Sequence, residues 1–193
     1  MVLPPYRYDF LQLLGLLWLL FWGYWLIAAR SAKRTVRGPA WAGWIALRLV
    51  LAVVIVALQR ARLLHGLVSA APGPVAEALG VALCAAGMGV AVWARRHLGR
   101  NWGTPMSAKM EPVLVTSGPY AWVRHPIYAG LLLALAGSAL VLGPVWLAPA
   151  VLLIAGAYFL YAARAEEALL ARQLPEAYPR YRARTRLLIP FVL

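Results

Sequence analysis

Five apolar stretches, each long enough or nearly long enough to cross a bilayer as a helix, follow one another along the chain. They cover residues 10–29, 40–58, 75–94, 127–142 and 145–163. A hydrocarbon core of about 30 Å requires roughly 20 helical residues, so we expect each stretch to be a transmembrane helix. Only Gly143 and Pro144 separate the last two, which therefore predicts a tight helical hairpin.

The composition agrees with lipid as the main solvent. Of the 193 residues, 63% are hydrophobic and 13% are charged, against about 45–50% and 25% in soluble domains. A soluble globular domain and a disordered chain are both excluded by this excess. The predicted fold class is an all-α integral membrane protein with about five transmembrane helices. We expect a single membrane domain, with three helices in residues 10–94 and a cofactor-binding half in residues 95–193.

The basic residues predict the orientation of these helices. Lys and Arg number 19 against 6 acids, and they fall in clusters between the apolar stretches. Nucleic-acid binding would need this charge on one solvated face, so the clusters favour a membrane. With the N-terminus outside, fifteen Lys and Arg are cytoplasmic and three are external. We therefore expect a multi-pass protein of the inner or plasma membrane, with the segment 95–126 and the C-terminal tail in the cytoplasm.

A few polar and small residues inside the apolar stretches predict helix contacts. Arg48 and Glu77 are costly in hydrocarbon, so they are expected to pair with each other or to extend toward an interface. Gly130, Ala134 and Ser138 recur every four residues, a spacing that lets another helix approach closely. We interpret this small-residue stripe as a packing surface.

Cysteine and histidine predict neither a disulfide nor a metal site. Cys84 is the only cysteine, so no internal disulfide can form. The three histidines are far apart in sequence and lack the spacing of metal ligands.

The segment 113–130, which reads VLVTSGPYAWVRHPIYAG, carries the first candidate chemistry. Its Ser-Gly-Pro sequence predicts a turn at residues 117–119. Proline is disfavoured after a helical residue and favoured at the first helical position, so His125 is expected to be the N-cap of a helix that begins at Pro126. The free N–H groups of that helix start, with Arg124 beside them, predict an anion-binding spot. Anchoring of the helix at the headgroups is the alternative.

A pair of adjacent acids carries the second candidate chemistry. Glu166 and Glu167 follow Arg164 at the end of the fifth apolar stretch. Adjacent helical residues diverge by about 100°, so one acid can face a pocket while the other faces water or Arg164. The hairpin places these acids and the helix start at the same cytoplasmic end. A carboxylate beside an anion site suits a zwitterion, such as the amino-acid part of S-adenosylmethionine. The Tyr- and Arg-rich tail that follows is expected to be an interfacial anchor or a lid.

These residues together resemble a known family. Leu-Val-Thr-Ser-Gly-Pro-Tyr, then Arg-His-Pro-x-Tyr-x-Gly, Glu-Glu-x-x-Leu, Tyr-x-x-Tyr and a late Ile-Pro are similar to the isoprenylcysteine carboxyl methyltransferases, to which phospholipid N-methyltransferases are related. The match covers roughly residues 93–190. The resemblance implies that S-adenosylmethionine binds at the cytoplasmic end of the last helices. The expected cofactor-binding residues are Pro112, Val113, Leu114, Val115, Tyr120, Arg124, His125, Pro126, Ile127, Tyr128 and Glu166.

The resemblance also predicts the reaction and its partners. We expect direct in-line transfer of a methyl group to a lipophilic acceptor that enters from the membrane lipids. O-methylation of a carboxylate is favoured, and N-methylation of an amine is next. The candidate catalytic residues are Glu167, as a base toward an amine, and Arg164. Family members that act on prenylated proteins carry an arginine four residues before the cofactor-binding acid, where this chain has Ala162. That departure leaves the acceptor open.

Two other functions compete with this hypothesis. Integral-membrane lipid and sterol reductases that use NADPH end in a comparable hairpin, but their motif more often reads Arg-His-x-Asn-Tyr, which Pro126 and Ile127 do not fit. A non-enzymatic membrane subunit would make the acid pair and the helix start incidental.

Overall fold

Helices make up most of the chain in the computed structural model, which describes residues 5–30, 35–37, 72–102, 108–109, 113–143 and 147–189. The long helices are α1 (Pro5–Ala29), α3 (Pro74–Leu98), α4 (Pro126–Leu142) and α5 (Leu147–Gln173), and α6 (Ala177–Arg184) is shorter. Single 3₁₀ turns form η1 (Gly99–Asn101) and η2 (Gly118–Ala121). Strands β1 (Thr35–Arg37) and β2 (Ala108–Lys109) pair antiparallel, a small sheet that the all-helical prediction did not include.

Four of the five predicted apolar helices lie in the described chain. Prolines set their starts, since α3 and α4 each begin with a proline at the first position. The first helix begins at Pro5, five residues earlier than predicted, and α5 runs to Gln173, ten residues beyond its predicted end. Good helix formers such as Ala, Glu, Leu and Arg fill that extension. The predicted stretch 40–58 lies outside the described residues.

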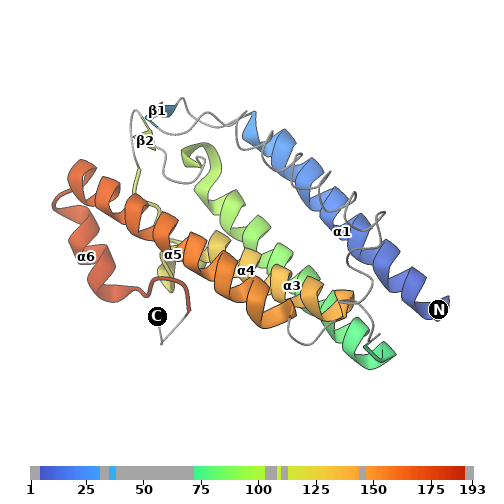
Figure 1. Ribbon diagram of the computed structural model, residues 1–193. Helices are drawn as coiled ribbons and strands as arrows, with labels where there is room; N and C mark the ends of the chain where they lie inside the picture. The colour runs from blue at the N-terminus through green and yellow to red at the C-terminus, as the bar shows by residue number, and fades with distance from the viewer. Residues whose placement is uncertain are drawn as a thin grey trace.

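The long helices run side by side and define two ends of a bundle (Figure 1). The starts of α1 and α3 meet the end of α4 at one end, where Arg7 bonds both Glu77 and the carbonyl of Leu142. We call this the Arg7 end. The ends of α3 and α5, the start of α4 and the helix α6 lie at the other (Figure 1), which we call the His125 end.

The closest helix contact joins α3 to α4 through small residues. A Cβ atom on Gly87 would overlap the backbone of Gly130 and Ala134, and a Cβ on Gly137 would overlap the backbone of Gly80. Larger side chains would therefore separate the two helices. The stripe predicted from Gly130 and Ala134 lies in this contact, which confirms its packing role.

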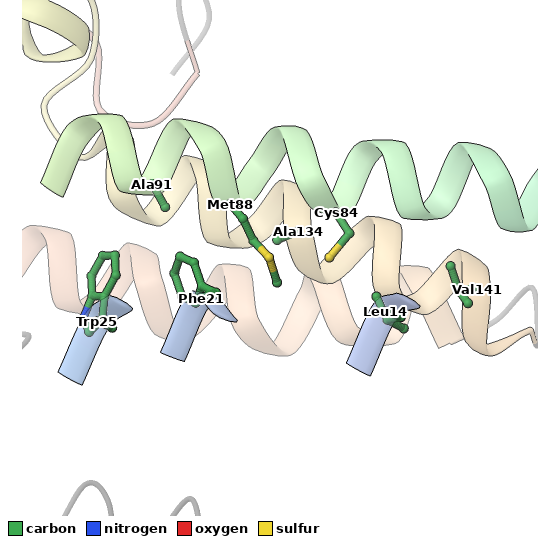
Figure 2. Close-up of a cluster of buried hydrophobic side chains, with 8 residues drawn as sticks. All are labelled: Leu14, Phe21, Trp25, Cys84, Met88, Ala91, Ala134 and Val141. Carbon is green, nitrogen blue, oxygen red and sulfur yellow. The ribbon is translucent and has the colours of Figure 1, made fainter. Parts of the chain in front are cut away.

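Aromatic side chains of α1 cover the α3–α4 contact (Figure 2). The indole Nε1 of Trp18 donates to Ser138 Oγ across 3.1 Å. Ser138, the polar residue of the stripe, therefore has a partner on α1. Ser138 in turn donates to the carbonyl of Ala134. The buried members of this core are Leu14, Phe21, Trp25, Cys84, Met88, Ala91, Ala134 and Val141.

Large apolar side chains on the outer faces of the helices are exposed. Leu19 on α1 is 70% exposed, and Leu153 and Ile154 on α5 are 74% and 73% exposed. Among the described residues, Tyr6–Ala29 and Pro74–Asn101 are long and apolar enough to cross a membrane, and Pro126–Leu142 is a shorter apolar helix. Such outward-facing apolar surface suits a lipid environment. The number of spans and their orientation stay predictions.

Buried arginines tie the helices together at each end. Arg7 donates to Glu77 Oε1 at 2.9 Å and to the carbonyl of Leu142 at 3.0 Å, so it joins α1, α3 and α4. Glu77 was expected to pair with Arg48 or to extend toward an interface, and Arg48 lies outside the described residues. The early start of α1 explains the contact with Arg7, because it brings Arg7 into the first turns of the bundle. Near the His125 end, Arg95 donates to the carbonyl of Ala28 and so joins α3 to α1.

Candidate active site

The start of α4 has the geometry that the His-Pro sequence predicts. His125 is the N-cap and Pro126 is the first helical residue. The His125 side chain makes no capping hydrogen bond, which leaves its ring for other partners. The C-terminal segment fixes the backbone here, because the N–H of Arg124 donates to Arg186 O at 2.8 Å and the N–H of His125 donates to Leu187 O at 3.0 Å. The site is therefore built partly by residues some 60 positions further along the chain.

Both acids of the predicted pair meet this helix start. Glu166 Oε1 accepts a hydrogen bond from the Tyr128 hydroxyl at 2.5 Å, and Glu166 Oε2 lies 3.4 Å from His125 Nδ1. Glu167 accepts from Arg124 Nε, and its Oε1 lies 3.8 Å from His125 Nε2. The two acids thus share His125 but take different hydrogen-bond donors, Tyr128 for Glu166 and Arg124 for Glu167. The prediction that the helix start and the acid pair meet is confirmed.

The charges of this cluster stabilise one another. Burial alone would raise the pKa of Glu167, but the nearby His125 and the hydrogen bond from Arg124 lower that pKa to about 2. Burial alone would lower the pKa of His125, but the two carboxylates Glu166 and Glu167 raise it. The cluster therefore holds Glu167 as a carboxylate and favours the protonated form of His125. A carboxylate with so low a pKa is a weak base.

A stack of aromatic rings packs against the cluster of His125, Glu166 and Glu167. The rings of His125 and Tyr128 stack at 5.4 Å with 2° between their planes, and Tyr128 stacks on Phe159 at 4.9 Å. Phe159 was not predicted as a site residue. It lies seven residues before Glu166 and thus on the same face of α5, which is the sequence signal that identifies it. Ala162, which has no exposed surface, shares this face and packs in the same cluster.

The C-terminal tail packs over the segment that precedes α4. The Tyr181 hydroxyl donates to the carbonyl of Tyr120 at 2.8 Å, and Arg124 Nη1 donates to the carbonyl of Thr185 at 2.5 Å. Burial raises the pKa of Tyr181 to about 12 and raises that of Tyr120 as well. Thr185 was not predicted, because it contributes a backbone carbonyl, which every residue type carries. The tail is thus a structural part of the site.

The other predicted site residues lie at varying distances from this cluster. Residues 113–115 are described without regular secondary structure and are partly or fully exposed. Pro112 lies outside the described residues. Ile127 is half-buried and packs in the core on both sides of α4. Arg164 is exposed, in contrast to the buried Glu167 one turn further on.

Comparison with known proteins gives the context for this geometry. No curated protein sequence matches the chain. The phospholipid methyltransferase family model matches residues 75–177, which is more than half of the chain and includes α3, α4 and α5. A solved structure of the eukaryotic intramembrane Ras methyltransferase, isoprenylcysteine carboxyl methyltransferase, is similar with a TM-score of 0.55 and 23% identity.

That similarity covers 81% of this chain and 55% of the methyltransferase chain, and at this identity it shows a common fold. The chain spans about half the length of that protein, so the activity of the whole protein is not transferred by the fold. The family model rests on the sequence itself, and it agrees with the resemblance found in the motifs. The chain belongs to the phospholipid methyltransferase family, whose members are enzymes that transfer methyl groups.

Proposed function

We propose that the protein is an integral-membrane methyltransferase that uses S-adenosylmethionine to methylate a lipid-like acceptor. The observation that carries the proposal is the contact of Glu166 with the start of α4, through Tyr128 and His125. This contact lies within the residues that match the phospholipid methyltransferase family. It joins a carboxylate to a helix N-terminus at one end of the bundle.

The polar groups at this end fit the amino-acid part of the cofactor. The Glu166 side chain is 23% exposed, compared with 9% for Glu167, so Glu166 is the more accessible acid for an ammonium group. The first N–H groups of α4 have no partners within the helix and suit a carboxylate. Within the described chain, the buried Nε2 of His125 has no hydrogen-bond partner. A bound polar ligand would provide one.

The cofactor's chemistry defines what the protein has to contribute. When bound, S-adenosylmethionine supplies a methyl group on a positively charged sulfur for direct transfer to the acceptor. Glu166 and the start of α4 would orient the cofactor. Correct orientation of the reacting groups can remove a large part of the activation barrier to methyl transfer. Glu167 was predicted as a base, but its pKa of about 2 favours another role, which is to hold Arg124 in place. Arg164, exposed near the end of the apolar part of α5, is available to an anionic group of the acceptor.

A carboxylate is the favoured acceptor group, because it needs no base. The weak basicity of Glu167 supports this preference over an amine, which must arrive deprotonated. At the position where enzymes for prenylated proteins carry an arginine, Ala162 has no exposed surface and packs beside Tyr128. A long charged side chain would not fit that contact. The proposed acceptor is therefore a lipophilic acid that enters from the bilayer, while the cofactor enters from the cytoplasm.

Calorimetry with the detergent-purified protein tests the cofactor site. We expect S-adenosylhomocysteine to bind the wild type and to lose about a hundredfold in affinity with Glu166→Gln, since a charged contact to the ligand is removed. Glu176→Gln, at an exposed acid before α6, is the matched control and keeps wild-type affinity. Binding of NADPH in place of S-adenosylhomocysteine, or full affinity in Glu166→Gln, would contradict the proposal.

Transfer of a radiolabelled methyl group identifies the acceptor class. Membranes that contain the protein are incubated with methyl-labelled S-adenosylmethionine, and the lipid fraction is treated with mild base. A methyl ester releases its label under these conditions, whereas a methylated amine keeps it. Release of the label is the expected result, and retention would show that an amine is the acceptor.

A further inference from the structure

A cleft on the outer face of α3 lies outside the cluster of acids described above. It has a volume of about 420 Å³, within the range of small-molecule sites, and it is lined by Gly89, Val92, Trp93, Arg96 and His97. These residues share one face of the helix, because they recur at intervals of three and four. The cleft thus lies on the last turns of α3. These turns are at the His125 end of the bundle (Figure 1).

One end of the cleft is apolar and the other is cationic. A Cβ atom on Gly89 would meet nothing within 4 Å, so the helix surface is open at this point. Trp93 is 41% exposed, and its ring lies 6.0 Å from that of Trp122, which is 58% exposed. Exposed indoles of this kind are typical of the interface between hydrocarbon and water. Arg96 and His97 follow on the next turn, and both are exposed.

The apolar end continues into the lipid-facing surface of the helix. Val75 and Leu79, on the first turns of α3, are 72% and 58% exposed. The intervals from Val75 through Leu79 to Gly89 and Trp93 keep these residues near one side of the helix. An acyl chain that lies along this surface would therefore reach the cleft from the bilayer. A soluble anion would gain no binding energy from the apolar part.

The His97 ring at the polar end of the cleft is held in place by neighbouring groups. His97 Nδ1 lies 3.0 Å from the carbonyl of Trp93, and the rings of the two residues meet edge to face at 5.7 Å. A Cβ atom on Gly118 would overlap the His97 ring, so the turn at η2 packs directly against it. A ring held by these contacts loses little side-chain freedom when a ligand binds beside it.

We propose that this cleft binds one anionic phospholipid at a site separate from the cofactor. The acyl chain lies against Gly89, Val92 and Trp93, and the phosphate lies at Arg96. Charge complementarity supports this occupant, since Arg96 lies at the polar end of the cleft and none of its described lining residues is acidic. Basic residues beside an apolar surface at a helix end select anionic headgroups.

Native mass spectrometry of the purified protein in a neutral detergent tests the site. Phosphatidylglycerol and phosphatidylcholine with the same acyl chains are titrated separately. We expect one phosphatidylglycerol to bind at least fivefold more tightly than phosphatidylcholine, the ratio that one basic residue near a headgroup provides. Inorganic phosphate at equal concentration should not displace the lipid, because it lacks the acyl chain.

Two substitutions locate the binding. Gly89→Leu places a side chain in the apolar part, where a Cβ atom meets nothing within 4 Å, and should lower the affinity for phosphatidylglycerol to that of a protein without the site. Arg96→Gln should lower this affinity about fivefold. Gly23→Leu on α1, at another position open to a Cβ atom, and Arg172→Gln, at an exposed arginine of α5, are the matched controls. Both controls should bind phosphatidylglycerol as the wild type does.

The proposal is overturned if Gly89→Leu keeps the wild-type affinity for phosphatidylglycerol, or if phosphate displaces the lipid. Calorimetry with S-adenosylhomocysteine separates this result from the test of the proposed function. The Gly89→Leu variant should bind that ligand normally, which shows that it folds and that the two sites differ. Loss of S-adenosylhomocysteine binding in a folded Gly89→Leu protein would assign the cleft to the cofactor and would also overturn the proposal.

Discussion

An arginine is paired with a glutamate at each end of the helix bundle, and the two pairs differ in what surrounds them. At the Arg7 end, the side chains of Arg7 and Glu77 are 3% and 0% exposed. At the His125 end, those of Arg124 and Glu167 are 10% and 9% exposed. The chemistry of the pairs is the same, and burial differs by less than a tenth of each side chain. Burial and pairing therefore do not distinguish a functional pair from a structural one.

The neighbours of each pair make the distinction. Arg7 Nη2 donates to the carbonyl of Leu142, so the pair joins three helices and meets no second acid among the described residues. The Arg124–Glu167 pair lies beside Glu166 and His125, which adds a second carboxylate and a titratable ring. A second acid beside a helix N-terminus is what a zwitterionic ligand requires. This difference explains why only the His125 end is proposed to bind a cofactor.

The largest expected effect is the loss of the pair at the Arg7 end. Arg7→Met leaves the buried Glu77 carboxylate without its cation, which should lower the free energy of unfolding by about 3–5 kcal/mol. Denaturation in detergent, followed by circular dichroism, measures the change. The affinity of the remaining folded protein for S-adenosylhomocysteine should not change.

The double variant Arg7→Met/Glu77→Leu is the control, because it removes both charges. It should recover most of the lost stability, since an apolar pair of similar volume often replaces a buried ion pair without loss. A selective loss of S-adenosylhomocysteine binding in either variant would show that the Arg7 end is more than structural, and the contrast between the ends would fail.

A smaller loss of stability is expected from Glu167→Gln at the His125 end. The substitution weakens the hydrogen bond from Arg124, and a charge-assisted bond contributes about 2 kcal/mol. Unlike Arg7→Met, this variant should also lower the affinity for S-adenosylhomocysteine, because Arg124 positions the segment before α4. Both quantities are measured on the same preparation. An unchanged affinity would indicate that Glu167 and Arg124 are structural in the same sense as the pair at the Arg7 end.

The dependence of stability on pH separates the ends further. The pKa of Glu167 is lowered to about 2, so its contribution is complete above the ordinary glutamate pKa of about 4.3 and is lost as pH falls toward 2. The pKa of His125 is raised, so its contribution is complete below about 6.5 and is lost as the pH rises through the folded-state pKa. Thermal midpoints between pH 3 and 9 measure both limbs. Glu167→Gln should flatten the acid limb, and an unchanged acid limb would contradict this assignment.

The smallest expected effect concerns the tail. Tyr181→Phe removes the hydrogen bond from the tail to the carbonyl of Tyr120, which should lower the free energy of unfolding by about 1 kcal/mol. Tyr161→Phe, at a tyrosine that is 65% exposed, is the control and should have no measurable effect. Equal effects from the two variants would show that the tail does not contribute to the site through this bond.

Much of the candidate site was predictable because it depends on local rules. His125 and Pro126 are an N-cap and a first helical residue by the stereochemistry of proline alone. The meeting of this helix start with Glu166 and Glu167 followed from a link of a few residues between two apolar stretches. The contact of Phe159 with Tyr128 follows from the same helical spacing.

Other parts of the site depend on backbone groups, which cannot be identified from residue type. Thr185 and Leu187 contribute carbonyl oxygens to Arg124 and His125, and Tyr120 contributes one to the tail. Any residue type would offer the same acceptor, so only the path of the chain selects them. The same holds for the contact of Glu77 with Arg7, which was not predicted, because the partner depends on which helix ends lie together.

The sequence by itself determined the apolar helices, their proline-marked starts, the hairpin and the family. Each of these depends on residue type and on spacing along one segment, where hydrophobicity and backbone stereochemistry act locally. Only the tertiary structure decided which arginine pairs with which acid, and that Glu166 rather than Glu167 is the more accessible carboxylate. Those outcomes depend on the relative positions of separate helices and of the C-terminal tail, because an ion pair forms wherever packing brings opposite charges within a few ångströms.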